Sequence, residues 1–273
     1  MFHTKQSQSG PARAFRLLEL IYHATVRNIR KSNGSAVMGL VMHLVQSIMM
    51  VLIFLFMFDL MGMRAMAIRG DFLLFIMSGI FMFMTHVKAI GAVSGADGPT
   101  SSMMMHAPMN PIISICGAAL GSLYQQTFAA CVVLFFYHAV FTPITIEFPA
   151  QTVGMFLLSW ASGVGIGMVL LSARPWQPEL MTILTGLIMR LNVIASGKML
   201  LANNTSPGIR SIFDWNPLFH TIDQGRGFIF LNYLPRYTSI EYPVYTTLAC
   251  ITIGLMAEFF TRQYASASWN IRR

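Results

Sequence analysis

Charged residues are scarce in this sequence. Asp, Glu, Lys and Arg make up 10% of its 273 residues, whereas a typical soluble domain contains about 25%. This scarcity argues against a water-soluble enzyme of this length. A disordered chain is excluded as well, because 55% of the residues are hydrophobic and disordered segments are poor in large apolar side chains.

Cysteine is scarce too, and the signatures of common enzymes are missing. Cys116, Cys131 and Cys250 lie inside apolar segments without CxxC spacing, so the sequence predicts no disulfide framework. It contains no GxxxxGK[ST], HExxH or GxSxG pattern, which excludes ATP binding through a Walker loop. The acidic residues fall at the ends of apolar segments or in loops, which disfavours an intramembrane enzyme.

Long hydrophobic runs dominate what is present. Each of six apolar segments approaches or exceeds the about 20 residues that a helix needs to cross about 30 Å of hydrocarbon. Backbone polar groups cannot stay unpaired in lipid, so each segment is predicted to be a helix. We therefore expect an all-α polytopic membrane protein with a six-span transmembrane domain over residues 36–273. The predicted spans are residues 36–58, 71–93, 112–140, 150–173, 179–201 and 243–262.

The first part of the chain, residues 1–35, differs from a secretory signal and is predicted to be a cytoplasmic region. Within residues 12–31, apolar side chains such as Phe15 and Leu18 fall on one helical face, and basic ones such as Arg27 fall on the other. This pattern is typical of an interfacial helix with basic residues near anionic lipid. A soluble amphipathic helix packed on a partner protein is the alternative.

The distribution of charge predicts the orientation of the chain. The net charge is +8, and more Lys and Arg residues fall on the side of the N-terminus than on the opposite side. Basic residues mark the cytoplasmic side of a membrane protein. An even number of spans then places both termini in the cytoplasm, and the basic excess is explained without nucleic acid.

The longest predicted loop, residues 202–242, faces outward. It is rich in aromatic and apolar residues, so short helices that dip into the membrane are expected. Asn216 followed by Pro217 predicts a helix start.

Three further residues of this loop, His220, Asp223 and Arg226, fall near one helical face, where Asp223 and Arg226 could pair. Because nucleophile and oxyanion partners are missing, we interpret them as a structural or gating cluster rather than a catalytic one.

Arg190 is the one charged residue placed near the middle of a predicted span. An intramembrane arginine costs roughly 2.5–3.5 kcal/mol on insertion scales, so it must face protein or water. It is predicted either to line a polar conduit or to bond carbonyls structurally.

Aromatic faces that could stack on sugars are supplied by Tyr124, Phe128, Phe135 and Trp160, although core packing or lipid contact is the favoured explanation for any single one of them. The 22 methionines suggest either flexible apolar packing or, less readily, binding of a soft metal.

The order of these features resembles the membrane subunit of an ABC-2 type exporter, most closely the capsular polysaccharide and O-antigen permeases. The stretch from Asn216 to Arg226, NPLFHTIDQGR, is similar to that family's Asn-Pro-Leu, His, acidic, Arg stretch before the last span. Arg190 followed by Ala195-Ser196-Gly197 resembles its Arg-then-Ser-Gly pattern. A glycine-rich fourth span completes the likeness, which covers nearly the whole chain.

The resemblance implies a transport subunit, not an enzyme, located in the bacterial inner membrane. It implies a homodimer that binds two copies of a separate ATPase, which holds the ATP and Mg, and exports a lipid-linked polysaccharide. Periplasmic or outer-membrane export proteins are further partners that it allows. The segment from Asn216 to Arg226 would form the gate helices. The inward loop from Ala96 to Met109 would couple to the ATPase through residues such as Asp97, Pro99, Met103, Met104, Met105 and His106.

Three alternatives stay open at this point. The first is an ABC-2 efflux permease for a small molecule. The second is a methionine-rich metal transporter, and the third is an intramembrane enzyme that modifies lipid or sugar.

Overall fold

Helices joined by loops and turns make up the described part of the chain. The structure is a computed structural model, and it describes residues 10–31, 35–60, 62, 71–97 and 110–271. These residues contain no strand, which confirms the all-α prediction. In chain order the helices are α1 (Gly10–Lys31), α2 (Ala36–Leu60), α3 (Phe72–Ser94), α5 (Pro111–Val140), α6 (Pro149–Ala173), α7 (Pro178–Ala195), the short 3-10 helix η1 (Ala202–Asn204), α8 (Pro207–Arg210), α9 (Pro217–Ile229) and α10 (Glu241–Ile271).

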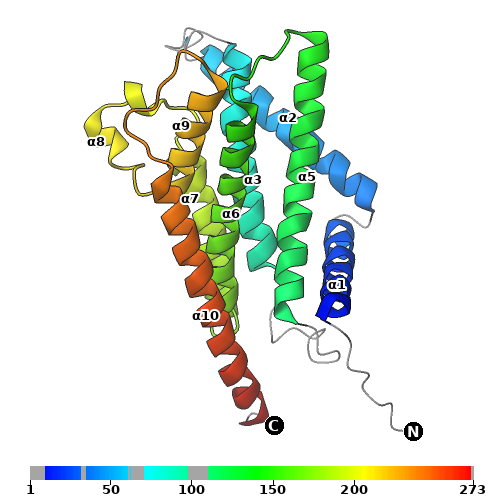
Figure 1. The fold of residues 1–273 in the computed structure, drawn as a ribbon. Coiled ribbons are helices and arrows are strands. Elements are labelled where there is room, and N and C mark those ends of the chain that lie inside the picture. Colours follow the sequence, from blue (N-terminus) through cyan, green and yellow to red (C-terminus); the bar gives the residue numbers. More distant parts are fainter. Residues whose placement is uncertain (1–9, 32–34, 61, 63–70, 98–109, 272–273) are drawn as a thin grey trace.

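Among the described residues, six helices are long and apolar enough to cross a membrane, namely α2, α3, α5, α6, α7 and α10. Each overlaps one of the six predicted spans, and the chain is a multi-pass membrane protein. In Figure 1, α1 and the C-terminal end of α10 lie at the lower end of the bundle, whereas α8 and α9 lie in its upper part. This arrangement agrees with an even number of crossings.

Helix starts are fixed by local side chains as well as by apolar length. Asp71 caps α3, where its carboxylate accepts a hydrogen bond of 2.9 Å from the Leu73 amide. The carboxylate also accepts hydrogen bonds from Tyr137 and Thr142 near the end of α5. Burial alone would raise the pKa of Asp71, but these hydrogen bonds lower it below its usual value. The charged cap therefore joins α3 to α5 at the upper end of the bundle.

Helix α3 is the core of the bundle. Within its most apolar stretch 89% of the residues are buried, against 17% in α2, 11% in α7 and 17% in α10. Helices α2, α5, α6, α7 and α9 all contact α3. The apolar outer surfaces of α2, α7 and α10 are thus left for lipid or for another protein chain.

Glycines set how closely α6 approaches its neighbours. A Cβ atom on Gly163 would lie 2.3 Å from the backbone oxygen of His86, and one on Gly167 would lie 2.8 Å from Cβ of Val93. On the opposite side, a Cβ atom on Gly165 would lie 3.0 Å from Cβ of Cys250 in α10. The glycine-rich segment therefore lets α6 pack against α3 and α10 with backbones almost in contact.

The fifth predicted span ends earlier than expected. Residues 179–201 were expected to be one helix, but α7 ends at Ala195. Gly197 adopts φ +61°, and a Cβ atom there would lie 2.2 Å from the ring of Phe219. Only glycine fits this left-handed conformation and close approach without strain. The shorter helix places Arg190 in the C-terminal third of α7 rather than near its middle.

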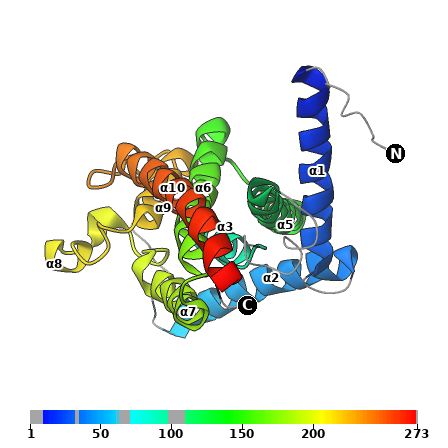
Figure 2. The same cartoon turned by 90° about the horizontal axis from the view of Figure 1, so that it is seen from below.

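Helix α1 runs across the long helices rather than along them. Figure 2, seen from below, shows α1 along its length, whereas α5 is seen nearly end-on. The two helices cross at Gly117, where a Cβ atom would lie 2.7 Å from Cβ of Ala24. This is the orientation that an interfacial helix takes in the plane of a membrane.

Candidate functional site: the segment before the last helix

Helix α9 begins where the sequence predicts, and its cap also reaches α7. The side-chain oxygen of Asn216 accepts a hydrogen bond of 3.0 Å from the Leu218 amide, and Pro217 occupies the first turn. The amide nitrogen of Asn216 donates to the side-chain oxygen of Asn192 and to the backbone oxygen of Ala195, each at 2.9 Å. One side chain therefore starts α9 and holds it against the end of α7.

We expect Asn216→Ala to destabilise the protein more than Asn110→Ala. Both residues cap a helix, since Asn110 accepts a hydrogen bond of 3.1 Å from the Ile112 amide. A lost cap costs about 1 kcal/mol. Asn110 is exposed, whereas Asn216 is buried and leaves two acceptors on α7 without their donor, at a further cost of about 1–3 kcal/mol. Thermal unfolding of the two purified variants in one detergent measures the difference, and equal losses would contradict the second role of Asn216.

Arg226 is the largest fully buried side chain that the structure describes. Its guanidinium donates to the backbone oxygen of Leu200 at 2.7 Å and to that of Lys198, and it lies 3.9 Å from the centre of the Phe75 ring. Burial lowers the pKa of Arg226 to about 10, opposed by the nearby charge of Asp223, so the side chain stays protonated near neutral pH. It therefore joins α9 to residues 196–206, the segment between α7 and α8, and packs against α3.

Asp223 anchors the opposite side of α9. Its carboxylate accepts hydrogen bonds from the hydroxyls of Tyr233 and Thr238, and from the Ala202 amide at 3.3 Å. Burial, followed by the negative charge of Asp223, raises the pKa of Tyr233 and keeps that hydroxyl protonated as a donor. The expected ion pair with Arg226 does not form between the two described side chains, because each is committed to other partners.

His220 connects the loop before α9 to the loop before α10. Its Nε2 atom lies 2.9 Å from the backbone oxygen of Asp214, and its Nδ1 atom accepts a hydrogen bond of 3.1 Å from the Ser239 amide. This pattern assigns the proton to Nε2 and makes the ring a bridge between two loop segments. Its ring centre lies 4.7 Å from that of Tyr242.

Lys198 is a second buried cation that the sequence analysis did not single out for the site. Its Nζ atom donates to the backbone oxygen of Val193 at 2.6 Å and lies 3.7 Å from the centre of the Phe83 ring. Burial lowers the pKa of Lys198 to about 8. The residue follows the turn at Gly197, so an unusual backbone conformation and a buried ammonium group occur side by side.

A chain of polar contacts joins α9 to the middle of the bundle. Ser159 of α6 donates to the hydroxyl of Thr221 at 2.8 Å. His86 of α3 places Nδ1 2.9 Å from the hydroxyl of Ser162 and 3.0 Å from the backbone oxygen of Ser159. Pattern and spacing along the sequence give no sign of this chain, because its members come from three separate helices.

The residues predicted to line a substrate path lie on different surfaces. Arg190 is exposed on α7 and forms no hydrogen bond or ion pair with any residue that the structure describes. Phe128 and Phe135 are exposed on α5, and Tyr124 faces the space between α5 and α1. The indole of Trp160 donates to the backbone oxygen of Ala119 at 3.0 Å, so this side chain ties α6 to α5. The structure does not gather the five into one surface within a single subunit.

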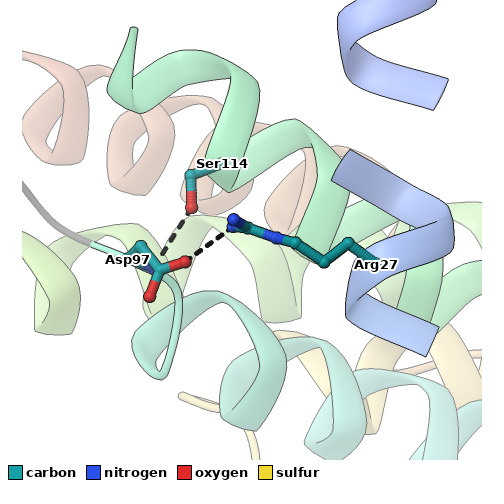
Figure 3. A network of polar contacts seen from close by, with 3 residues as sticks. All are labelled: Arg27, Asp97 and Ser114. Atoms are coloured by element: carbon teal, nitrogen blue, oxygen red, sulfur yellow. Dashed lines mark hydrogen bonds and ion pairs between the residues drawn. The ribbon is translucent and has the colours of Figure 1, made fainter. Parts of the chain in front are cut away.

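Asp97, the first of the predicted ATPase-coupling residues, is bound to the amphipathic helix. Its carboxylate lies 2.7 Å from the guanidinium of Arg27, and Figure 3 shows the two side chains pointing toward each other. Its backbone amide also donates to the hydroxyl of Ser114 at 3.1 Å. The other residues of this prediction, Pro99, Met103, Met104, Met105 and His106, lie outside the described residues.

The segment from Asn216 to Arg226 is held in place by hydrogen bonds of buried side chains. Asn216, Asp223, Arg226 and His220 are all buried and hydrogen-bonded, which suits a rigid element rather than a reactive one. No group of three or more His, Cys, Asp or Glu side chains that could hold a metal occurs within the described residues. The chain matches no protein-family model and no curated protein.

Proposed function

We propose that this chain is the membrane-spanning subunit of an ABC-2 type exporter that moves a lipid-linked capsular or O-antigen type polysaccharide across the bacterial inner membrane. The observation that carries the proposal is the segment from Asn216 to Arg226, whose residues resemble those of that family. In this chain the segment is a buried helix locked to α3, α6 and α7 directly before the last span. Such an element suits a gate at the outward end of the bundle.

The proposed assembly is a homodimer with two copies of a separate ATPase. The sequence contains no Walker loop, so ATP and Mg would be held by the partner. Helices α2 and α7 bury few of their residues within one subunit, which leaves surface for a second copy. Arg190 on α7 is among the exposed residues, and a water-filled conduit between the two copies would supply the polar surroundings that an intramembrane arginine needs.

Copurification tests the proposed ATPase partnership. We expect tagged wild-type protein, extracted in mild detergent, to bring down a soluble ATPase in equal amount. Arg27→Glu breaks the ion pair that holds Asp97 to α1 and should weaken the complex, whereas the double variant Arg27→Glu and Asp97→Arg should recover much of it. Absence of any ATPase, together with an effect on sensitivity to copper, would support the metal-transport alternative, whereas a copurified ATPase with an effect on drug sensitivity alone would support the ABC-2 efflux permease.

Arg190 gives a test of the conduit. We expect Arg190→Leu to insert, to dimerise and to bind the ATPase, because no described group in the subunit loses a partner. Export should nevertheless fall by roughly tenfold or more if the charge contacts substrate, as for other truncated charged contacts. Arg190→Lys, which lacks the planar fork of donors, should fall in between. Normal surface glycan with the Leu variant would remove Arg190 from the conduit.

Cysteine labelling in intact cells tests the orientation of the chain in the membrane. We expect Gly208→Cys, placed in a chain whose three native cysteines are replaced, to react with a membrane-impermeant maleimide. Gly208 is exposed with open space around it and lies at the end of the bundle opposite α1. Asn270→Cys should react only after the membrane is permeabilised. The reverse pattern would place both termini outside.

A further inference from the structure

A cavity of about 780 Å³ opens between α1, α2 and α5. Its size lies within the roughly 300–1,000 Å³ of small-molecule sites. Side chains from all three helices line it, and Figure 2 shows α1 beside α5 with one end close to α2. The residues that matter most for the argument are Leu18, Tyr22 and Arg30 of α1, and Leu123, Tyr124 and Thr127 of α5.

The walls of this cavity are apolar, and they are open to the surroundings. Leu18 is 61% exposed and Tyr22 is 65% exposed. The hydroxyl of Thr25, which also lines the cavity, donates to the backbone oxygen of Ile21 at 2.8 Å and is satisfied within its own helix. In water such a surface would be costly, but in a bilayer it accepts hydrocarbon.

The depth of the cavity matches the boundary between headgroups and acyl chains. Helix α5 has 30 residues and is about 45 Å long at 1.5 Å per residue, which exceeds the about 30 Å of hydrocarbon by roughly 15 Å. If the upper end of α5 lies at one membrane surface, its first ten residues lie in the opposite headgroup layer. Helix α1 crosses α5 there, at Gly117. Leu123 and Thr127 lie farther along α5, on the hydrocarbon side of the crossing.

Few polar groups line this cavity, and one of them is the guanidinium of Arg30. Arg30 is exposed, lines the cavity, and forms no hydrogen bond or ion pair with any described residue. Arg27, about one helical turn before Arg30, is already bound to Asp97. A guanidinium without a partner among the described residues, beside an apolar cavity, complements a phosphate with attached acyl chains, because basic pockets between membrane helices bind lipid headgroups.

We propose that this cavity is a binding site for an anionic phospholipid of the leaflet on the side of α1, with its acyl chain between α1 and α5 and its phosphate on Arg30. The lipid would fill the space under α1 and hold this helix at the membrane surface. The site lies apart from α7 and α9, so it does not depend on the identity of the transported substrate.

Competitive lipid retention tests the proposal. Wild-type protein is reconstituted in nanodiscs of equal phosphatidylglycerol and phosphatidylcholine, transferred to detergent and washed, and the retained lipid is counted by mass spectrometry. We expect about one phosphatidylglycerol per chain. Arg30→Gln should retain about five- to tenfold less, whereas Arg16→Gln, on the same helix but outside the cavity, should retain the wild-type amount. Equal retention of both lipids by the wild type, or full retention by Arg30→Gln, would overturn the headgroup assignment.

Filling the cavity and crosslinking within it test the acyl-chain assignment. Leu123→Trp should reduce retention, whereas Leu157→Trp, at an exposed position of α6, should not. A photoreactive benzoylphenylalanine at Thr127 should form a lipid adduct in the wild-type background. A crosslink to another segment of this chain or to a second copy, with no lipid adduct, would show that protein rather than phospholipid covers the cavity. Gel filtration checks that each variant folds, and transport activity plays no part in the readout.

Discussion

Gly163→Ala is expected to be among the most damaging single changes in this protein. A Cβ atom at this position would lie 2.3 Å from the backbone oxygen of His86 and 3.0 Å from Cβ of Ala89. Backbone atoms cannot swing aside as a side chain can, so α6 must move away from the central helix α3. Overpacking of a well-packed core typically lowers the free energy of unfolding by about 1–3 kcal/mol. We expect Gly163→Ala to lower it by an amount at or above the upper end of this range.

Gly154→Ala in the same helix provides the matched control. No atom lies within 4 Å of a Cβ atom placed on Gly154, and alanine is favoured over glycine in a helix by up to about 1 kcal/mol. We therefore expect this variant to be as stable as the wild type or more stable. Thermal unfolding in detergent, followed by gel filtration, separates the two cases. A Gly163→Ala protein that melts together with Gly154→Ala would contradict the close packing of α6 on α3.

The second large effect is expected for Arg226→Leu. Removal of the guanidinium leaves the backbone oxygens of Lys198 and Leu200 without their donor in a fully buried site. A buried acceptor left without its donor costs about 1–3 kcal/mol, and two acceptors lose theirs here. Arg226→Lys keeps the charge but not the two-pronged donor geometry, so it should recover only part of the stability.

Two further variants identify the cause of that effect. Arg236 lies in the same outward segment but is exposed, so Arg236→Leu should leave the melting temperature nearly unchanged. Gly79 provides the space for Arg226, since a Cβ atom there would lie 2.7 Å from Nη2 and 2.8 Å from the backbone oxygen of Lys198. Gly79→Ala should therefore mimic Arg226→Leu. Wild-type stability in Gly79→Ala would show that the contact with Arg226 does not hold residues 196–206 in place.

The sequence was most informative where a feature is local. Apolar length alone predicts the six spans, and the predicted bounds of the third, 112–140, differ from those of α5 by one residue. Asn216 and Pro217 predict the start of α9 because an N-cap asparagine followed by proline favours a helix start whatever its surroundings. Amphipathic spacing likewise predicts α1, because the face of a helix is determined by its own residues.

Contacts between distant segments could not be predicted in the same way. The apolar run continues through Leu200 and Leu201, so hydropathy extends the fifth span beyond the turn that Gly197 makes. Tyr233 and Thr238 bind Asp223 only because the loop after α9 folds back over it. Trp160 looks like a sugar-stacking residue by type, yet its indole bonds Ala119 of another helix. In each case the contact joins a residue to another element of the fold, which the local sequence pattern does not reveal.

The presence of polysaccharide on the cell surface tests the proposed export most directly. If the chain is the proposed bacterial exporter, its deletion in the source organism should abolish surface polysaccharide and cause the lipid-linked precursor to accumulate inside the inner membrane. The wild-type chain supplied on a plasmid should restore both, and Arg190→Leu should not. A deletion strain with normal surface polysaccharide and no internal precursor would contradict the proposed substrate.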